Sequence, residues 1–141
     1  VECLNRIGIT NPKVAILGAV EMVHQNMQAT LDAALISKMA QRGQIKNCLV
    51  DGPLAFDNVV SSESAHHKGI KSEVAGDTDL LLLPNIETGN VLYKALVWFG
   101  KAKLAGIILG ASAPVVLTSR SDSEESKLNS IILAAVSTKN D

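Results

Sequence analysis

Apolar and polar positions follow two patterns that alternate along the chain, and these patterns predict its elements. Short continuous apolar runs are typical of strands buried on both faces. Longer stretches with apolar residues three and four positions apart are typical of amphipathic helices. The runs that predict strands are residues 13–17, 48–51, 79–83, 105–109 and 114–117, and the stretches that predict helices are residues 1–7, 27–42, 54–60, 88–101 and 123–136.

Strands and helices in this order predict an α/β fold. Because the strands are apolar throughout, we expect a parallel or mostly parallel sheet with helices on both faces, which makes three layers, α/β/α. The link at residues 110–113 breaks the alternation, since it is too short for the crossover that joins parallel strands. We therefore expect residues 105–109 and 114–117 to pair in antiparallel fashion, or the chain to pass there from one sheet to another.

Three of the predicted helices, residues 27–42, 88–101 and 123–136, have a clear apolar face. Gly43 follows the first of them, at the place where helices commonly end in a left-handed conformation. Residues 61–76, by contrast, are polar and weakly patterned, and they predict a loop with at most one short element. The predicted faces comprise Leu31, Ala34, Leu35 and Met39 in the first of these helices, Val91, Leu92, Ala95, Leu96 and Phe99 in the second, and Leu128, Ile131, Ile132, Ala135 and Val136 in the last.

The composition narrows the class of protein. Apolar residues make up 47% and charged residues 19%, which is typical of globular proteins. A net charge of −1 without blocks of like charge argues against nucleic-acid partners and a basic membrane patch, and no apolar run is long enough to cross a bilayer. Cys3 and Cys48 fit no metal or redox spacing, so we expect two buried free thiols and a cytoplasmic location. The adjacent His66 and His67 are poorly spaced for one metal ion, and no metal site is expected.

Polar residues follow the apolar runs at three places, and ligands of open α/β sheets bind at the carboxyl ends of strands. The first is Asp51-Gly52-Pro53, with Asp57 six residues after Asp51. Two carboxylates there would suit hydrogen bonding or acid–base work. Alternatively, Asp51 caps the next helix and Gly52-Pro53 forms the turn that ends the strand.

The second place is the polar run at residues 84–90, which joins a predicted strand to a predicted helix. Free backbone N–H groups at a helix start bind anions, and glycine permits a close approach. Asn85, Gly89 and Asn90 are the candidate binding residues in this run. The alternative is an ordinary helix start with Asn85 or Thr88 as its cap.

The third place is Thr118-Ser119-Arg120, which leads into the last predicted helix. Arg120 is one of three arginines, and its planar guanidinium suits phosphate. Ser121 with Glu124 has the spacing of a capping box. The alternative role for Arg120 is to neutralise Glu124 or Glu125.

Four strings extend over most of the chain: VDGPLAFD at residues 50–57, KSEVAGD at 71–77, LPNIETGNVLYK at 83–94 and PVVLTSR at 114–120. Together they resemble the phosphate acetyl/butyryltransferase family, and most of all its phosphate butyryltransferase branch. The resemblance implies an enzyme that interconverts acyl-CoA and phosphate with acyl phosphate and CoA, for butyryl or branched short-chain acyl groups. Coenzyme A is then a substrate, and no cofactor is implied.

The resemblance also implies two α/β domains around a cleft, in the broad architecture of isocitrate dehydrogenases. Residues 1–112 correspond to the second domain, and residues 113–141 to a C-terminal strand and helix that return to a first domain outside this chain. Because family members are about twice as long and the chain starts at Val1, we expect a fragment with little activity alone. We expect a homo-oligomer, or pairing with the N-terminal half, to cover the Leu128/Ile131/Ile132 face.

The resemblance assigns roles to several residues. It implies that Arg120 holds phosphate or acyl-phosphate oxygens and that Ser119 interacts with the reacting acyl group or sulfur. Acetyl-specific relatives carry an aspartate where Ser126 stands here, so the base is open among Asp122, Glu124 and Glu125. The residues implied to line the cleft are Asp51, Gly52, Pro53, Asn85, Gly89 and Asn90.

Two other functions remain open at this point. The first is a non-catalytic binding or assembly module that keeps the family fold, which the departure at Ser126 allows. The second is a phosphate acyltransferase of the fatty-acid/phospholipid type, which would use a longer acyl group carried on a protein.

Overall fold

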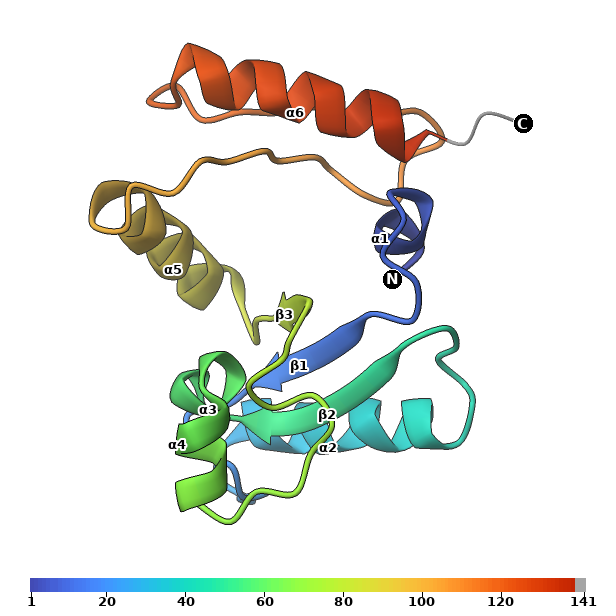
Figure 1. The fold of residues 1–141 in the computed structure, drawn as a ribbon, viewed down its shortest axis with the longest axis vertical. Helices are drawn as coiled ribbons and strands as arrows, with labels where there is room; N and C mark the ends of the chain where they lie inside the picture. The colour runs from blue at the N-terminus through green and yellow to red at the C-terminus, as the bar shows by residue number, and fades with distance from the viewer. Residues whose placement is uncertain (139–141) are drawn as a thin grey trace. The chain divides into compact units, whose positions relative to one another are not determined.

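The computed structural model describes residues 1–138 and divides the chain into two compact units (Figure 1). The first unit comprises residues 10–89 with Val1, and the second comprises residues 2–9 and the chain from Asn90 onward. The elements are, in chain order, α1 (Glu2–Arg6), β1 (Lys13–Leu17), α2 (Gln28–Gln41), β2 (Leu49–Leu54), α3 (Phe56–Val60), α4 (Ser62–His67), β3 (Leu80–Leu82), α5 (Ile86–Trp98) and α6 (Glu124–Ser137).

The sheet of the first unit has three parallel strands in the order β2-β1-β3. Val14 of the central strand pairs with Val50 on one side and with Leu80 on the other. Figure 1 shows α2 alongside β1 and β2, with α3 and α4 at the ends where the two arrowheads lie. The predicted α/β fold with a parallel sheet is therefore confirmed, whereas the isocitrate dehydrogenase-like architecture of a longer protein stays a prediction.

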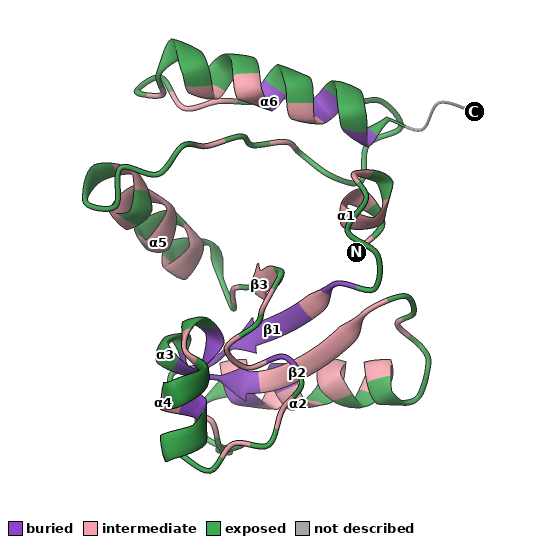
Figure 2. Ribbon diagram, viewed as in Figure 1, coloured by how far each residue is buried: buried purple, intermediate pink, exposed green. Residues whose placement is uncertain are grey.

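The core of the first unit is built on β1, whose last four residues are buried (Figure 2). Ala15 and Leu17 contact Leu54, Val59 and Val74 in one cluster. The buried face of α2 is formed by Thr30 and Ala33, while Leu35 is 62% exposed. The predicted face of this helix is thus wrong in part, because its small residues lie inside where the helix packs closely on β2.

Strand β2 does not end at Gly52-Pro53 as predicted, but continues to Leu54. Proline is tolerated because β2 is an edge strand, where one side of the backbone needs no partner in the sheet. Gly52 is required here by space, since an added Cβ would lie 2.8 Å from the Cβ and the carbonyl oxygen of Ile16. The backbone N–H of Gly18 then donates to the carbonyl of Leu54 (2.9 Å), which holds β1 against the far end of β2.

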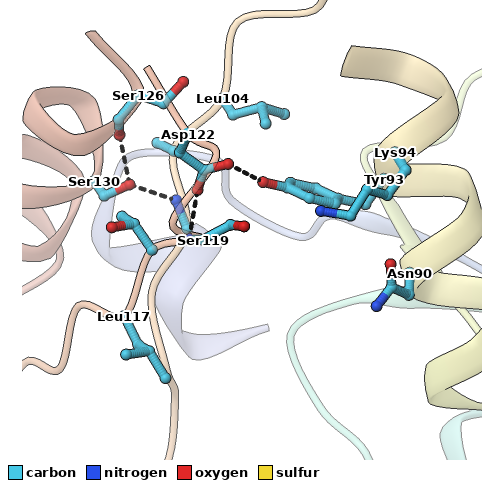
Figure 3. Close-up of a pocket in the computed structure, with 12 residues that line it drawn as sticks. Asn90, Tyr93, Lys94, Leu104, Leu117, Ser119, Asp122, Ser126 and Ser130 are labelled. Carbon is cyan, nitrogen blue, oxygen red and sulfur yellow. Dashed lines mark hydrogen bonds between the residues drawn. The ribbon is translucent and has the colours of Figure 1, made fainter. Parts of the chain in front are cut away.

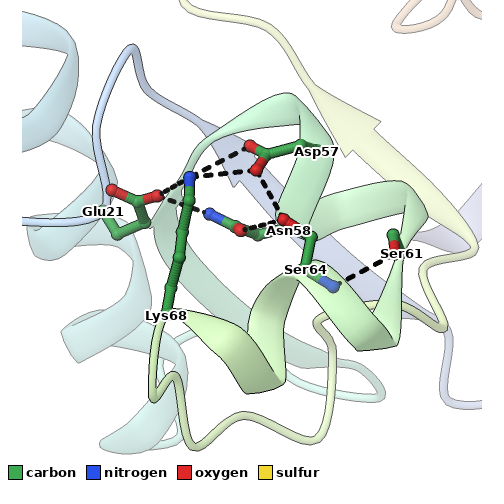
Figure 4. A network of polar contacts seen from close by, with 6 residues as sticks. All are labelled: Glu21, Asp57, Asn58, Ser61, Ser64 and Lys68. Carbon is green, nitrogen blue, oxygen red and sulfur yellow. Dashed lines mark hydrogen bonds and ion pairs between the residues drawn. The ribbon is translucent and has the colours of Figure 1, made fainter.

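The predicted loop at residues 61–76 contains helix α4, which Ser61 caps by accepting a hydrogen bond from the Ser64 N–H (3.1 Å). A polar network holds α3 and α4 to the segment after β1 (Figure 4). Asn58, fully buried, donates to a Glu21 carboxylate oxygen (2.8 Å). Lys68 forms ion pairs with both Glu21 and Asp57, the latter at 3.0 Å.

The second unit contains α1, most of α5, an extended segment and α6. Residues 105–109 and 114–117 are not strands, which makes that prediction wrong. Only one antiparallel bridge, Ile108 with Val115, joins them, so the predicted direction of pairing holds at that point. Within residues 1–138 no further strand pairs with either segment, and a two-stranded ladder by itself is only marginally stable, which explains the difference.

Helix α6 buries its small residues and exposes its large apolar ones (Figure 2). Ser130, Ala134 and Ser137 are buried, and α1 packs against this helix. The predicted apolar face is exposed: Leu128 57%, Ile131 59%, Ile132 50% and Val136 54%. The expected exposure is confirmed, and what covers the face stays a prediction.

Both cysteines are free, as expected, but each is only half-buried. Burial nevertheless raises the pKa of the Cys48 thiol. No helix among residues 1–138 is long and apolar enough to cross a membrane.

Candidate functional site

A pocket of about 400 Å³ lies within the second unit (Figure 3). One wall is the part of α5 that carries Asn90, Tyr93 and Lys94. The opposite wall is formed by residues 104–106, residues 117–119 and the start of α6. The pocket thus combines an apolar lining with a few polar groups, as small-molecule sites commonly do.

The polar centre of this pocket is the carboxylate of Asp122 (Figure 3). The Tyr93 hydroxyl donates to one carboxylate oxygen at 2.6 Å, and the Ser119 N–H donates to the other at 2.7 Å. The Asp122 N–H donates back to the Ser119 carbonyl at 3.1 Å, which closes a turn over residues 119–122. One side chain therefore joins the Ser119 turn to α5.

These contacts set the charge state of the pair. The hydrogen bond from the Tyr93 hydroxyl is the largest influence on the pKa of Asp122 and lowers it. Burial raises this pKa and the hydrogen bond from the Ser119 N–H lowers it, so that the pKa lies below its usual value. The hydrogen bond to Asp122 raises the pKa of Tyr93 above its usual 10.0. At neutral pH the site therefore holds a carboxylate and a neutral phenol.

Helix α6 begins differently from the prediction. Ser123, not Ser121, is the N-cap, and its hydroxyl accepts a hydrogen bond from the Ser126 N–H at 3.1 Å. Ser121 instead lies beside Ser119, with their hydroxyl oxygens 3.0 Å apart. The turn made by Asp122 delays the helix start, so the predicted capping box does not form.

Two serines of α6 connect the helix to the opposite segment. The Ser130 hydroxyl accepts a hydrogen bond from the Gly106 N–H (2.9 Å) and donates to the Ser126 carbonyl (2.7 Å). Ser130 is almost completely buried, although sequence reasoning did not single it out. The available signal was its spacing of four from Ser126, which places both serines on one face of the helix.

Comparisons with known proteins show which family the chain belongs to. The model of the phosphate acetyl/butaryl transferase family matches residues 1–135. The chain belongs to this family. It is 60% identical over 136 residues to the phosphate butyryltransferase of Clostridium acetobutylicum, covering 96% of this chain and 45% of that protein. It is also 60% identical over 136 residues to the phosphate acetyltransferase of Thermotoga maritima, covering 96% of this chain and 46% of that protein.

A solved structure extends the comparison to the fold. The chain superimposes on a branched-chain phosphotransacylase from Enterococcus faecalis V583 with a TM-score of 0.86 and 40% identity, covering 96% of this chain and 49% of that one. The chain thus spans about half the length of the transferase-family proteins that it matches. The family resemblance inferred from the sequence is confirmed.

Of the candidate residues, Ser119 and Asn90 line the same pocket. Arg120 follows Ser119 directly but is exposed and is not among the lining residues. Within residues 1–138 it forms no ion pair, and Glu125 pairs with Lys103 instead, at 2.6 Å. Within residues 1–138 Arg120 pairs with neither Glu124 nor Glu125, so the alternative in which it neutralises one of them is wrong, and its guanidinium is available for an anion.

The remaining candidates belong to the first unit. Asp51 lines a separate, open cavity of about 560 Å³ with Lys71, Ser72 and Glu73. Its carboxylate accepts a hydrogen bond from the Gly52 N–H at 2.8 Å, and Ala55, not Asp51, occupies the cap position of α3. The capping alternative for Asp51 is thus wrong. Gly52 and Pro53 lie in β2, where Gly52 passes close to β1.

Asn85 caps α5, since its side-chain oxygen accepts a hydrogen bond from the Thr88 N–H at 2.8 Å. The ordinary helix start expected there is confirmed, with Asn85 rather than Thr88 as the cap. Gly89 lies inside α5, next to the Leu83 side chain. A role in binding substrate stays a prediction for Asn85, Gly89 and the Asp51-Gly52-Pro53 group.

Proposed function

We propose that this chain is part of a phosphate acyltransferase, which interconverts acyl-CoA and phosphate with acyl phosphate and CoA. The observation that carries the proposal is the pocket beside Ser119-Arg120, in a chain 60% identical to a phosphate butyryltransferase and a phosphate acetyltransferase. We propose butyryl or branched short-chain acyl groups as substrates. Coenzyme A acts as a substrate, and the reaction needs no further cofactor.

The chemistry requires donors where negative charge develops. In the direction of acyl-CoA synthesis, the thiol sulfur attacks the acyl carbonyl and forms a C–S bond, and the C–O bond to phosphate breaks. The thiol proton ends on the departing phosphate, so atoms and charges balance. Donors fixed near the carbonyl oxygen stabilise the charge that accumulates there.

Ser119 and Arg120 are the residues that we assign to this task. The Ser119 N–H is engaged by Asp122, so we assign the interaction with the acyl carbonyl or the sulfur to its hydroxyl, which can still donate when it accepts a hydrogen bond from Ser121. The Arg120 guanidinium, exposed beside the pocket, suits the phosphate oxygens because it presents paired N–H donors. Asn90, on the facing helix, is the third candidate for contact with substrate.

The rest of the proposal concerns the assembly. We propose that residues 1–112 belong to a second domain and that residues 113–141 return to a first domain outside this chain. The exposed Leu128/Ile131/Ile132 face is then covered by that half or by another copy. A cytoplasmic location is part of the same proposal.

The test is an acyl-transfer assay that follows thiol release from butyryl-CoA, isobutyryl-CoA and acetyl-CoA in the presence of phosphate. The complete gene product is compared with the 141-residue chain alone. We expect turnover with the short acyl groups from the former and little or none from the latter. Normal turnover by the chain alone would contradict the need for a second half, and absence of transfer by the complete protein would contradict the proposed activity.

The second candidate is a non-catalytic binding or assembly module. Ser126 favours it: the family resemblance implies an aspartate at this position in acetyl-specific relatives, whereas here Ser126 interacts with its neighbour Ser123. Crystals soaked separately in CoA and in phosphate distinguish the two. Binding of neither near Ser119 favours the module, and a chain-length series distinguishes the fatty-acid type of enzyme.

A further inference from the structure

The carboxylate of Asp122 is the only acidic group among the pocket-lining residues (Figure 3). It accepts hydrogen bonds from Tyr93 and Ser119, one on each oxygen. Its backbone N–H also donates to the Ser119 carbonyl. The turn that carries Ser119 and Arg120 is therefore held by one residue through side chain and backbone together.

Two neighbouring carboxylates make poor alternatives as a base for the thiol. Glu124 and Glu125 are exposed in the first turn of α6 and do not line the pocket. Glu125 is moreover engaged by Lys103. Among the acidic side chains of this unit within residues 1–138, Asp122 is the one that lines the pocket.

The contacts of Asp122 suit a holding role better than proton transfer. An ionised carboxylate is purely an acceptor, and both of its oxygens are already bonded to donors. These donors stabilise the ionised form and lower its pKa, which leaves it a weak base for a thiol with a pKa of about 8.5.

We propose that Asp122 is a positioning residue that fixes the Ser119-Arg120 turn against Tyr93, and that it does not receive the thiol proton. This inference rests on the proposed transferase function. Asp122 and Tyr93 together form a clamp. The neutral Tyr93 hydroxyl joins the turn to α5, which also carries Asn90. The clamp thereby sets the distance between the groups on the two sides of the pocket.

Two substitutions separate positioning from proton transfer. Asp122→Ala removes both contacts, whereas Asp122→Asn keeps an oxygen for the Ser119 N–H and offers an amide N–H to the Tyr93 oxygen. In the complete gene product we expect Asp122→Ala to lower kcat by about tenfold or more, because misplaced groups lose rate steeply. We expect Asp122→Asn to restore most of that loss and to leave the pH dependence of kcat unchanged. Glu63→Gln, at an exposed carboxylate of α4 in the first unit, is the control and should behave as the unmodified protein.

If Asp122 were instead the general base for the thiol, the two variants would behave differently. A general base raises kcat by about a hundredfold or more. If kcat of Asp122→Asn were as low as that of Asp122→Ala, and its pH dependence were changed, the positioning role would be overturned. An Asp122→Ala variant with unchanged kcat would overturn it as well.

A second measurement does not depend on activity. Tyr93 is the only tyrosine of the chain, so the ultraviolet absorbance change of phenol ionisation reports on it alone. In the 141-residue chain we expect Tyr93 to ionise above pH 10.0, its usual pKa, and at lower pH in Asp122→Ala. Identical titrations would refute the clamp. A clamp seen by titration in a protein without acyl transfer would instead refute the proposed function alone.

Discussion

At the scale of single residues, Arg120 differs from the other two arginines of the chain by its position. Arg42 lies at the C-terminal cap of α2, and Arg6 lies in α1. Arg120 is the arginine that directly follows Ser119 of the candidate site, and within residues 1–138 it forms no ion pair. Its proposed role is to bind charge that develops during acyl transfer.

Arg120→Ala is expected to lower kcat/KM of the complete protein by about a hundredfold or more, because a lost donor to transition-state charge has this size of effect. Steady-state kinetics with butyryl-CoA and phosphate measure it. Arg42→Ala removes an exposed arginine of the first unit and serves as the control, with no change expected. Equal kinetics for both variants would exclude Arg120 from the chemistry.

Gly52→Ala is expected to destabilise the protein by about 1–3 kcal/mol, because the new methyl group would overlap Ile16 of the neighbouring strand. The free energy of unfolding in urea, followed by circular dichroism, measures the loss. Gly106→Ala is the control, since nothing lies within 4 Å of its added Cβ. A Gly52→Ala variant as stable as this control would mean that β1 and β2 separate easily at this point.

Some residues of the pocket could be predicted from the sequence and others could not. Ser119 and Asn90 were singled out from their places beside predicted helix starts, and both line the pocket. The Tyr93–Asp122 contact was out of reach, because a hydrogen bond between side chains 29 positions apart depends on how the chain folds back. Nothing in the local pattern distinguishes such a pair from two surface residues.

At the scale of elements, the first strand was predicted with its observed ends, and the long helices α2, α5 and α6 were predicted with ends that differ by one to three residues. Periodicity is a strong signal in long segments. It failed at residues 105–109 and 114–117, where an apolar run requires neighbouring strands to become a strand itself. The cap of α6 was harder to predict: the spacing of Ser121 and Glu124 predicted Ser121, whereas Ser123 is the cap.

The start of α6 allows a direct comparison of Ser121, the predicted cap, with Ser123, the observed one. Ser123→Ala removes the hydroxyl that accepts from the Ser126 N–H, and we expect a loss of about 1 kcal/mol in the free energy of unfolding. Ser121→Ala should cost clearly less, because that hydroxyl caps no helix. Thermal and urea unfolding of the two variants measure the difference. Equal losses would contradict the cap assignment.

At the scale of the whole molecule, the free energy of unfolding depends on pH through the ion pairs of Lys68 with Glu21 and Asp57 in the first unit (Figure 4). The hydrogen bond from Lys68 is the largest influence that lowers the pKa of Glu21, and the Ser64 hydroxyl is the largest that lowers the pKa of Asp57, followed by Lys68. A carboxylate with a folded-state pKa below its usual value stabilises the fold above that usual value. This stabilisation is lost as pH falls through the folded-state pKa.

Stability is therefore expected to decline as pH falls below 4.5 and 3.8, the usual values for these two carboxylates. Lys68→Met should reduce the decline, because both pKa values move back toward those of the unfolded chain. Melting temperatures at about pH 7 and pH 3 measure it. Lys38→Met, at an exposed lysine bonded to Gln41, is the control with an unchanged decline. A Lys68→Met decline as large as that of the unmodified protein would show that solvent screens the network.

The amino-acid sequence by itself determined the α/β class, the parallel strands of the first unit, the long helices and membership of the transferase family. These depend on local spacing and on strings of residues, which are visible without coordinates. Only the tertiary structure decided that α6 buries its serines and exposes its isoleucines, that Ser123 caps the helix and that Asp122 joins Ser119 to Tyr93. The reason is physical: periodicity shows that a helix has an apolar face, but which neighbour packs on a face, and which donor reaches a carboxylate, depends on contacts between distant segments.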